Sequence, residues 1–271
     1  MTDLKNRLID ILKKSVSDTE QIEAYKRIFS FIDLTTLEGT DTNKTVKELC
    51  QKARMFNDQS PQIPNVAAIC VYPNFIKLVK RELTGRNIKT ASVAGAFPSG
   101  QTSLQIKLEE IKYAIDQGAD EIDMVISRGK FLEGDVQYVE DEIASIKELC
   151  IDVHLKVILE CGELGSVENI RKASELAIKS GADFIKTSTG KIQPAATEEA
   201  VLVMADAIKE FYNSSGKKIG IKPAGGISTA EQALKYYLII RETLGIDWLN
   251  NRLFRIGASR LADDVYKKIV G

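Results

Sequence analysis

The sequence predicts an α/β protein folded as a (β/α)8 TIM barrel, and three observations support this prediction. The chain has 271 residues, 44% of them hydrophobic, and such barrels need about 250 residues. Short apolar runs alternate with amphipathic helical patterns along almost the whole length. The glycine-rich turn after the first strand, which an open doubly wound sheet more often has, is absent.

The first segment, residues 3–28, carries apolar side chains at helical spacing, and Ser17-Asp18-Thr19 predicts a break with a new helix cap. Strands are then predicted from short apolar or alternating runs at residues 29–35, 66–72, 89–94, 121–126, 154–160, 183–188, 218–223 and 254–257. Helices are predicted from one-sided apolar patterns at residues 42–57, 73–83, 103–117, 135–150, 166–180, 197–214, 229–244 and from 259 onward. No linker interrupts this order, so we expect one domain over residues 1–271, with helices in 1–28 and the barrel in 29–271.

Charge and composition exclude several classes of function. Lys plus Arg is 37 and Asp plus Glu is 38, so nothing suggests binding to nucleic acid or to a membrane surface. No signal pattern or membrane-spanning apolar run is present, which predicts a cytoplasmic protein. The four cysteines (Cys50, Cys70, Cys150 and Cys161) lack metal-like spacing, and His154 is the one histidine. We therefore expect no metal, no cofactor and no Ser-His-Asp triad.

Ionisable side chains occupy positions that should point into the barrel. Side chains of a barrel strand alternate between the interior and the helices. This alternation places Asp123, Lys156, Lys186 and Lys222 inward on four neighbouring strands, near the carboxyl ends where such barrels keep active sites. Any one of them could belong to a structural ion-pair network, but four together favour chemistry because unpaired buried charges are costly.

Lys186 stands where a strand would normally keep an apolar residue. Loss of hydration disfavours an ammonium group, and a lysine that becomes neutral can attack a carbonyl carbon. The segments Gly118–Asp123 and Gly181–Lys186 share a Gly-Ala-Asp-x-Ile frame, so Asp123 and Lys186 hold equivalent places on strands four and six. Alternate strands contribute to the same interior layer, and we expect these two side chains to face a common space.

Glycine-rich turns follow the seventh and eighth strands, at residues 223–228 and 257–260. These loops are the recurrent phosphate site of TIM barrels, because glycine lets backbone N–H groups approach an anion and a helix N-terminus adds a favourable dipole. Thr189-Gly190-Lys191 could close the site from strand six. Two glycine turns at both expected places therefore predict a phosphorylated ligand.

These motifs resemble those of the deoxyribose-phosphate aldolase family. The resemblance rests on segments 33–35, 97–100, 121–123, 155–160, 184–191, 220–226 and 255–259, in the right order. It implies a metal-free class I aldolase that reversibly cleaves 2-deoxy-D-ribose 5-phosphate to D-glyceraldehyde 3-phosphate and acetaldehyde. The N-terminal helices fall outside it. Many members are dimers, so the resemblance leaves a homodimer open.

The resemblance also implies roles for individual residues. Lys186 is similar to the Schiff-base lysine, Lys222 to the neighbour that lowers its pKa, Asp123 to the acid/base carboxylate, and Lys156 to a residue that supports Asp123. We expect repulsion from Lys222 to lower the Lys186 pKa more than burial does. The implied substrate- and phosphate-binding residues are Asp33, Thr35, Cys70, Thr189, Gly190, Lys191, Gly225, Gly226, Gly257 and Ser259.

Some alternatives stay open. Cys70 could be a plain core residue, and His154 is expected at the end of the barrel remote from the site. Some family members end in a flexible tail with a terminal tyrosine that assists proton transfer at the enamine carbon. Here Tyr266 is expected to be helical, so that step is expected to be slower or to be carried by Asp123 and water. The other functional hypotheses are a transaldolase-like Schiff-base enzyme and a sugar-phosphate-binding barrel without catalysis, although the presence of all three catalytic-type residues speaks against the latter.

Overall fold

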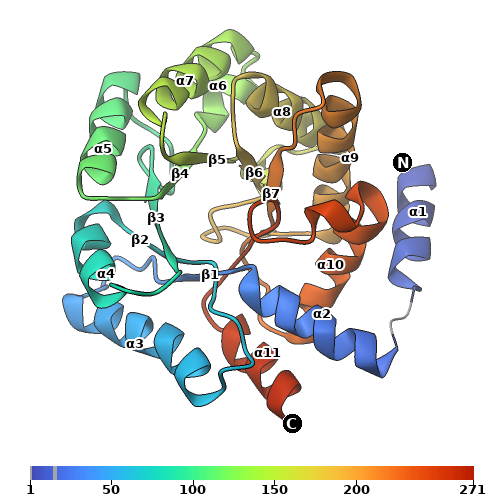
Figure 1. Ribbon diagram of the computed structural model, residues 1–271. Coiled ribbons are helices and arrows are strands. Elements are labelled where there is room, and N and C mark those ends of the chain that lie inside the picture. Colours follow the sequence, from blue (N-terminus) through green and yellow to red (C-terminus); the bar gives the residue numbers. More distant parts are fainter. Residues whose placement is uncertain (1, 15–16) are drawn as a thin grey trace.

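The computed structural model describes residues 2–14 and 17–271 and has the predicted (β/α)8 barrel (Figure 1). One eight-stranded sheet runs in the order β7-β6-β5-β4-β3-β2-β1-β8, with parallel pairing between neighbours. Two isolated bridges, Ile221 with Phe254 and Ala224 with Gly257, connect β7 to β8 and close the barrel. The strands are β1 (Ile32–Thr35), β2 (Ala68–Val71), β3 (Lys89–Ala94), β4 (Glu121–Val125), β5 (His154–Ile158), β6 (Phe184–Lys186), β7 (Gly220–Lys222) and β8 (Ile256–Ala258).

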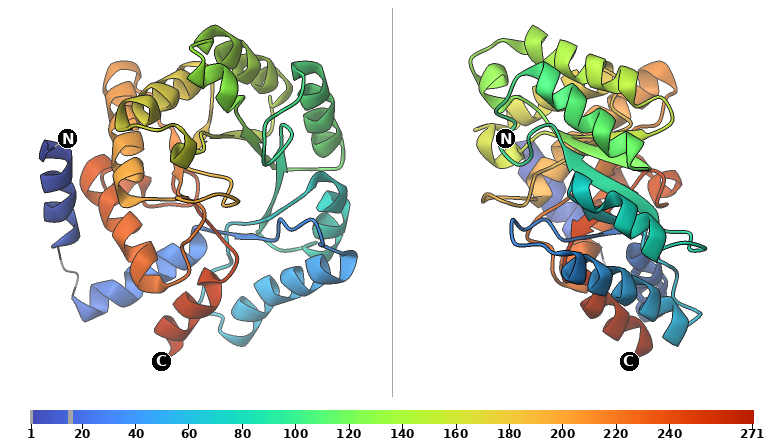
Figure 2. Two further views of the ribbon diagram at one scale, coloured as in Figure 1. Left: turned by 180° about the vertical axis from the view of Figure 1, so that it is seen from behind. Right: turned by 90° about the vertical axis from the view of Figure 1, so that its left-hand side faces the viewer.

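Helices surround the strands on the outside, as the two further views show (Figure 2). They are α1 (Thr2–Leu12), α2 (Asp18–Ser30), α3 (Asn43–Gln59), α4 (Ile76–Glu82), α5 (Leu104–Asp116), α6 (Arg128–Leu132), α7 (Val136–Leu149), α8 (Val167–Lys179), α9 (Glu198–Ser215), α10 (Ala230–Leu244) and α11 (Leu261–Val270). Short 3-10 turns are η1 (Pro73–Phe75), η2 (Cys161–Glu163) and η3 (Ile246–Trp248). Within the described residues, none of these helices combines the length and the apolar character needed to cross a bilayer.

The N-terminal helices pack outside the barrel ring. Helix α1 lies against α9 and α10, and α2 lies against α10 and α11 (Figure 1). The predicted new cap is confirmed: Ser17 caps α2, and the Ser17 side chain and Glu20 form a reciprocal capping box. Four more predicted helices begin at an N-cap whose side chain accepts a backbone N–H group of the first turn, at Thr42, Ser103, Thr197 and Thr229.

Several predicted boundaries are wrong. The first strand begins at Ile32 and not at residue 29, because Phe29 continues α2 and buries its ring against the barrel. The sixth and seventh strands have three residues each, since the chain leaves the sheet directly after Lys186 and Lys222. The short helix α6 was not predicted, because its five residues are too few to carry a periodic pattern.

The barrel interior has an apolar side and a charged side. A separate apolar cluster fills the interior beside β2, β3 and the carboxyl ends of β4 and β5, and includes Cys70, Val93, Val125 and Ile158. The charged side chains of β4 to β7 occupy the remaining space. Ile122 and Met124 face the helices in the outer core, so the predicted inward position of Asp123 is confirmed.

Candidate active site

Lys186 is the last residue of β6, and its backbone pairs with Ile158 of β5 and Lys222 of β7. The side chain is 2% exposed, and its ammonium nitrogen lies 2.8 Å from Oδ2 of Asp123. The expected meeting of Lys186 and Asp123 inside the barrel is therefore present. Because the strand ends here, the amine lies at the boundary between the packed interior and the open loops.

Asp123 lies at the centre of three buried lysines. Its carboxylate accepts hydrogen bonds from Lys156 at 2.8 Å, from Lys186 at 2.8 Å and from Lys222 at 2.6 Å. Burial opposes ionisation, but the three ammonium groups, Lys156 foremost, outweigh it and hold the pKa of Asp123 well below its usual range. Asp123 is thus a carboxylate in the resting protein. Asp123 and Lys156 occupy the middle of their strands, so the expectation that all four charges lie at strand ends is wrong for these two.

Burial is the main cause that lowers the pKa of Lys186, and repulsion from Lys222 adds to it, while Asp123 opposes both. The expectation that repulsion is the larger cause is therefore wrong. The physical reason is the position of Asp123, whose Oδ2 atom contacts both ammonium nitrogens and offsets much of their repulsion.

Lys222 is the lysine of the pair that is protonated in the resting protein. Burial disfavours its charge, but Asp123 at 2.6 Å and Asp33 at 2.5 Å outweigh burial and raise the pKa of Lys222 far above its usual value. One lysine of the pair thus tends toward the neutral amine while its neighbour keeps its proton. This asymmetry between two adjacent lysines suits a nucleophile and a proton donor.

Two further charged residues, Glu121 and Arg255, are buried beside Asp123 and Lys156 and were not among the predicted site residues. Arg255 precedes β8 and forms a two-pronged ion pair with Glu121, at 2.7 and 3.1 Å, and its Nη1 lies 2.6 Å from Asp33. Lys156 lies 2.6 Å from Glu121 and so connects this pair to Asp123. A signal for Glu121 was available, because Glu121 lies two residues before Asp123 and must share its inward face.

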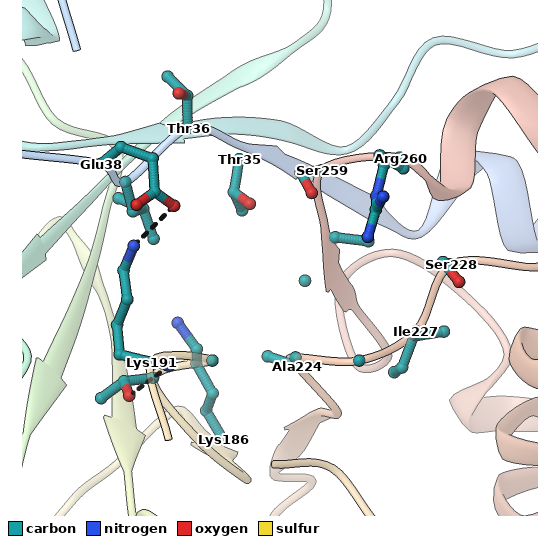
Figure 3. A pocket seen from close by; sticks show the side chains of 17 residues that line it. Thr35, Thr36, Glu38, Lys186, Lys191, Ala224, Ile227, Ser228, Ser259 and Arg260 are labelled. Atoms are coloured by element: carbon teal, nitrogen blue, oxygen red, sulfur yellow. Dashed lines mark hydrogen bonds and ion pairs between the residues drawn. The ribbon is translucent and has the colours of Figure 1, made fainter. Parts of the chain in front are cut away.

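A cavity of about 380 Å³ opens above Lys186 at the carboxyl ends of the strands (Figure 3). Of the predicted site residues, the cavity wall contains Thr35, Lys186, Thr189, Gly190, Lys191, Gly225, Gly226, Gly257 and Ser259. Asp33, Cys70, Asp123, Lys156 and Lys222 are instead fully buried and do not belong to this wall. Glu38 also lines the cavity and was not predicted, whereas Ser228 and Arg260 line it from the two predicted glycine turns.

The far wall of the cavity has the features of an anion site. In the described part of the chain, the backbone N–H groups of Gly190, Gly226 and Ser259 have no backbone or side-chain acceptor. Gly225 has a φ of 86°, and a Cβ atom there would lie 2.8 Å from Cα of Gly190. Only glycine therefore lets the two turns approach this closely, and both turns line the cavity.

Two cationic side chains line the cavity. Lys191 and Arg260 enter from different loops, after β6 and after β8, and Figure 3 shows both beside the cavity. The Lys191 ammonium lies 2.7 Å from the carboxylate of Glu38, whose loop follows β1. An incoming dianion would find two cations and would compete with Glu38 for one of them.

Glu160 fixes the loop that carries Lys191. It follows β5 with a φ of 57°, a strained conformation for a residue with a side chain. Its carboxylate accepts from the backbone N–H of Thr189 at 3.2 Å and from the Thr189 hydroxyl at 2.5 Å. The loop after β7 is bound to the loop after β6, because the Ser188 hydroxyl donates to the carbonyl of Ala224 at 2.5 Å. These hydrogen bonds fix the position of the loop after β6, which carries Lys191, relative to the glycine turn after β7.

Three other residues have simpler positions. Cys70 lies in the interior apolar cluster, and burial raises the pKa of its thiol to about 11, so the thiol stays protonated. His154 begins β5 at the opposite end of the barrel, as expected. Tyr266 lies within α11, where its ring packs on Phe56 and its hydroxyl lies 3.0 Å from the Ser60 hydroxyl.

Comparisons with known proteins agree with this geometry. The model of the DeoC/LacD family of aldolases matches residues 27–238. Human deoxyribose-phosphate aldolase is 43% identical over 270 residues, which cover 95% of this chain and 84% of the human protein. A solved structure described as QR15, an aldolase, is 28% identical with a TM-score of 0.71, covering 89% of this chain and 96% of its own. The tetrameric deoxyribose phosphate aldolase of Aeropyrum pernix, 23% identical with a TM-score of 0.70, has the same fold and covers 93% of this chain and 97% of its own.

Proposed function

Because the chain belongs to the DeoC/LacD family of aldolases, we propose that it reversibly cleaves 2-deoxy-D-ribose 5-phosphate through a Schiff base on Lys186. The products are D-glyceraldehyde 3-phosphate and acetaldehyde. One observation carries the assignment of Lys186: it is the buried lysine whose pKa is lowered and which also lines the cavity that contains the glycine turns. Lys156 and Lys222 are buried more deeply and keep their protons.

The first step is attack of the neutral Lys186 amine on the aldehyde carbon of the open-chain sugar. The carbinolamine loses water to give an iminium ion, which withdraws electrons as a metal ion would in another class of aldolase. Protons must be supplied and removed next to the lysine. The Lys222 ammonium can supply one and the Asp123 carboxylate can accept one, since both lie within hydrogen-bonding distance of each other at the inner end of the site.

Carbon–carbon cleavage then requires removal of the proton from the 3-hydroxyl group. The C2–C3 bond breaks, C3 becomes the aldehyde of glyceraldehyde 3-phosphate, and the electron pair moves into an enamine on Lys186. Asp123 is the group for this proton, because its pKa keeps it ionised before the step, and it acts through one water since it does not line the cavity. Protonation of the enamine and hydrolysis release acetaldehyde and restore the amine.

The phosphate would bind at the glycine turns at the other end of the cavity. Free N–H groups of Gly190, Gly226 and Ser259 and the side chains of Lys191 and Arg260 support this assignment. Binding there fixes the sugar so that its aldehyde end reaches Lys186, which supplies the orientation that the reaction needs. Thr35 also lines the cavity.

The remaining features extend the proposal. We infer that residues 1–271 fold as one domain, with residues 1–28 as a helical extension, supported by the packing of α1 and α2 on α9, α10 and α11. A homodimer remains the proposed assembly.

The test is an assay of sugar cleavage with the wild-type protein and Lys186→Ala. The wild-type protein should release glyceraldehyde 3-phosphate without added metal and at a rate that EDTA does not change. The variant should release none. The Lys107→Ala variant removes a buried lysine paired with Glu142 outside the barrel interior and should retain activity. Cleavage by Lys186→Ala, or no cleavage by a folded wild-type protein, would refute the proposed function.

A further inference from the structure

Seven ionisable side chains form one buried network inside the barrel. Each is no more than 5% exposed, and each lies within 4 Å of an oppositely charged member. The members are Asp33, Glu121, Asp123, Lys156, Lys186, Lys222 and Arg255. Charges this deeply buried interact through a medium that screens them weakly, so their sum matters.

The network is neutral without Lys186. Three carboxylates have pKa values held below their usual range by neighbouring cations, which outweigh burial, and are ionised. Lys156, Lys222 and Arg255 keep their protons, because neighbouring carboxylates outweigh burial and raise their pKa values. Three negative and three positive groups therefore balance, and a proton on Lys186 would leave one uncompensated positive charge inside the barrel.

The balance depends on a pair remote from the cavity. Arg255 holds Glu121 through both of its terminal nitrogens, and Glu121 holds Lys156 at 2.6 Å. Lys156 in turn contacts Asp123, the partner of Lys186. Neither Glu121 nor Arg255 lines the cavity, so neither can touch a substrate there.

We propose that Glu121 and Arg255 are positioning residues that set how readily the Lys186 amine takes up a proton, because each contributes one charge to the balance of the buried network. This proposal rests on the proposed role of Lys186 as the nucleophile. It predicts opposite effects from two changes at one ion pair. Arg255→Gln leaves an excess negative charge that favours a proton on Lys186, whereas Glu121→Gln leaves an excess positive charge that disfavours it.

The other titratable groups near this network are few. Lys186 faces Asp123 on β4, Lys222 on β7 and the Cys70 thiol on β2, which stays protonated. Glu121 also faces His154, whose Nδ1 lies 3.9 Å away and whose side chain is 54% exposed.

The expected displacement is about one pH unit in each direction. The contacts through Lys156 and Asp123 place Glu121 at a separation on the order of 10 Å from Lys186, where one charge shifts a pKa by about one unit at an effective dielectric constant of about 20. A loss of packing alone would lower activity in both variants without moving the pH midpoint in opposite directions. The sign of the shift therefore separates a positioning role from a structural one.

The experiment measures the pH dependence of Lys186 carbamylation by cyanate, followed on the tryptic peptide by mass spectrometry. This readout reports the neutral amine and needs no aldolase turnover. The midpoint should rise in Arg255→Gln, fall in Glu121→Gln and return toward the wild-type value in the double variant. Arg255→Lys, which keeps the charge, should stay near wild type. Glu142→Gln, which removes a fully buried carboxylate outside the barrel, is the matched control and should not shift the midpoint.

Midpoints that stay fixed, or that move in the same direction in both single variants, would overturn the proposal. If one variant fails to fold, the comparison of wild type, Arg255→Lys and the remaining variant still decides the sign. Sugar cleavage by the wild-type protein, measured in parallel, separates the two ideas. Cleavage with unmoved midpoints refutes the positioning role alone, whereas opposite shifts without cleavage refute the proposed function alone.

Discussion

Replacing Lys222 by methionine should move the pH dependence of the reaction to higher pH. The nitrogens of Lys186 and Lys222 lie 2.8 Å and 2.6 Å from the same oxygen of Asp123, which places them within about 5.4 Å of each other. Two positive charges at that separation repel by about 3 kcal/mol at an effective dielectric constant of about 20, equivalent to about 2 pKa units. The observed pKa shift should be smaller than this pairwise value, because Asp123 or Asp33 can take up a proton when Lys222 is absent.

The sign follows from the form of Lys186 that reacts. Removing Lys222 removes a cation that disfavours the Lys186 ammonium, so the pKa of Lys186 rises and less neutral amine exists at a given pH. The limb of the kcat/KM profile that reports Lys186 in the free enzyme should move up by one to about two units, with partial recovery of rate at high pH. Lys107→Met, the loss of a buried lysine paired with Glu142, should leave the midpoint in place. An unmoved midpoint in Lys222→Met would refute the electrostatic role of Lys222.

Three further predictions concern the anion site and stability. Glu160→Ala removes the acceptor of the Thr189 N–H and hydroxyl groups. It should raise KM for the phosphorylated sugar at least about tenfold, while kcat/KM for unphosphorylated 2-deoxyribose is retained. Equal losses for both sugars would contradict this role. Gly225→Ala should act in the same way, because its Cβ would meet Gly190 at a φ that disfavours side chains; an unchanged KM would contradict it. Because cations hold the pKa values of Asp123 and Glu121 below their usual range, their stabilising contribution is present above about pH 4 and is lost as the pH falls below it. Urea unfolding at pH 7 and pH 3.5 should therefore give a lower free energy of unfolding at the acidic pH, and equal values would contradict the prediction.

The alternation of side chains along strands was enough to predict much of the site. It placed Asp123, Lys156, Lys186 and Lys222 inward before any contact was known, and the same period would have found Glu121. Arg255 lies in the predicted strand at residues 254–257, and alternation with the outer-core residues Phe254 and Ile256 would have placed it inward as well, although β8 begins only at Ile256.

Electrostatic causes were harder to predict than positions. The sequence indicates that Lys186 and Lys222 are close, which suggests repulsion, but the balance depends on Asp123 contacting both nitrogens with one oxygen. Differences of a few tenths of an ångström between buried charges decide such a balance. The contact of Lys191 with Glu38 is also beyond sequence patterns, since it joins two loops that are distant in the chain.

The identity of the nucleophile is tested most directly by trapping the Schiff base with acetaldehyde and borohydride and mapping the product by mass spectrometry. Reduction converts the imine into a stable ethylamine on the lysine that formed it. The ethyl group should be on Lys186, appear more rapidly as the pH is raised through the pKa of that amine, and be absent in Lys186→Ala. A folded wild-type protein without an adduct, or with the ethyl group confined to Lys222 or Lys156, would contradict the account.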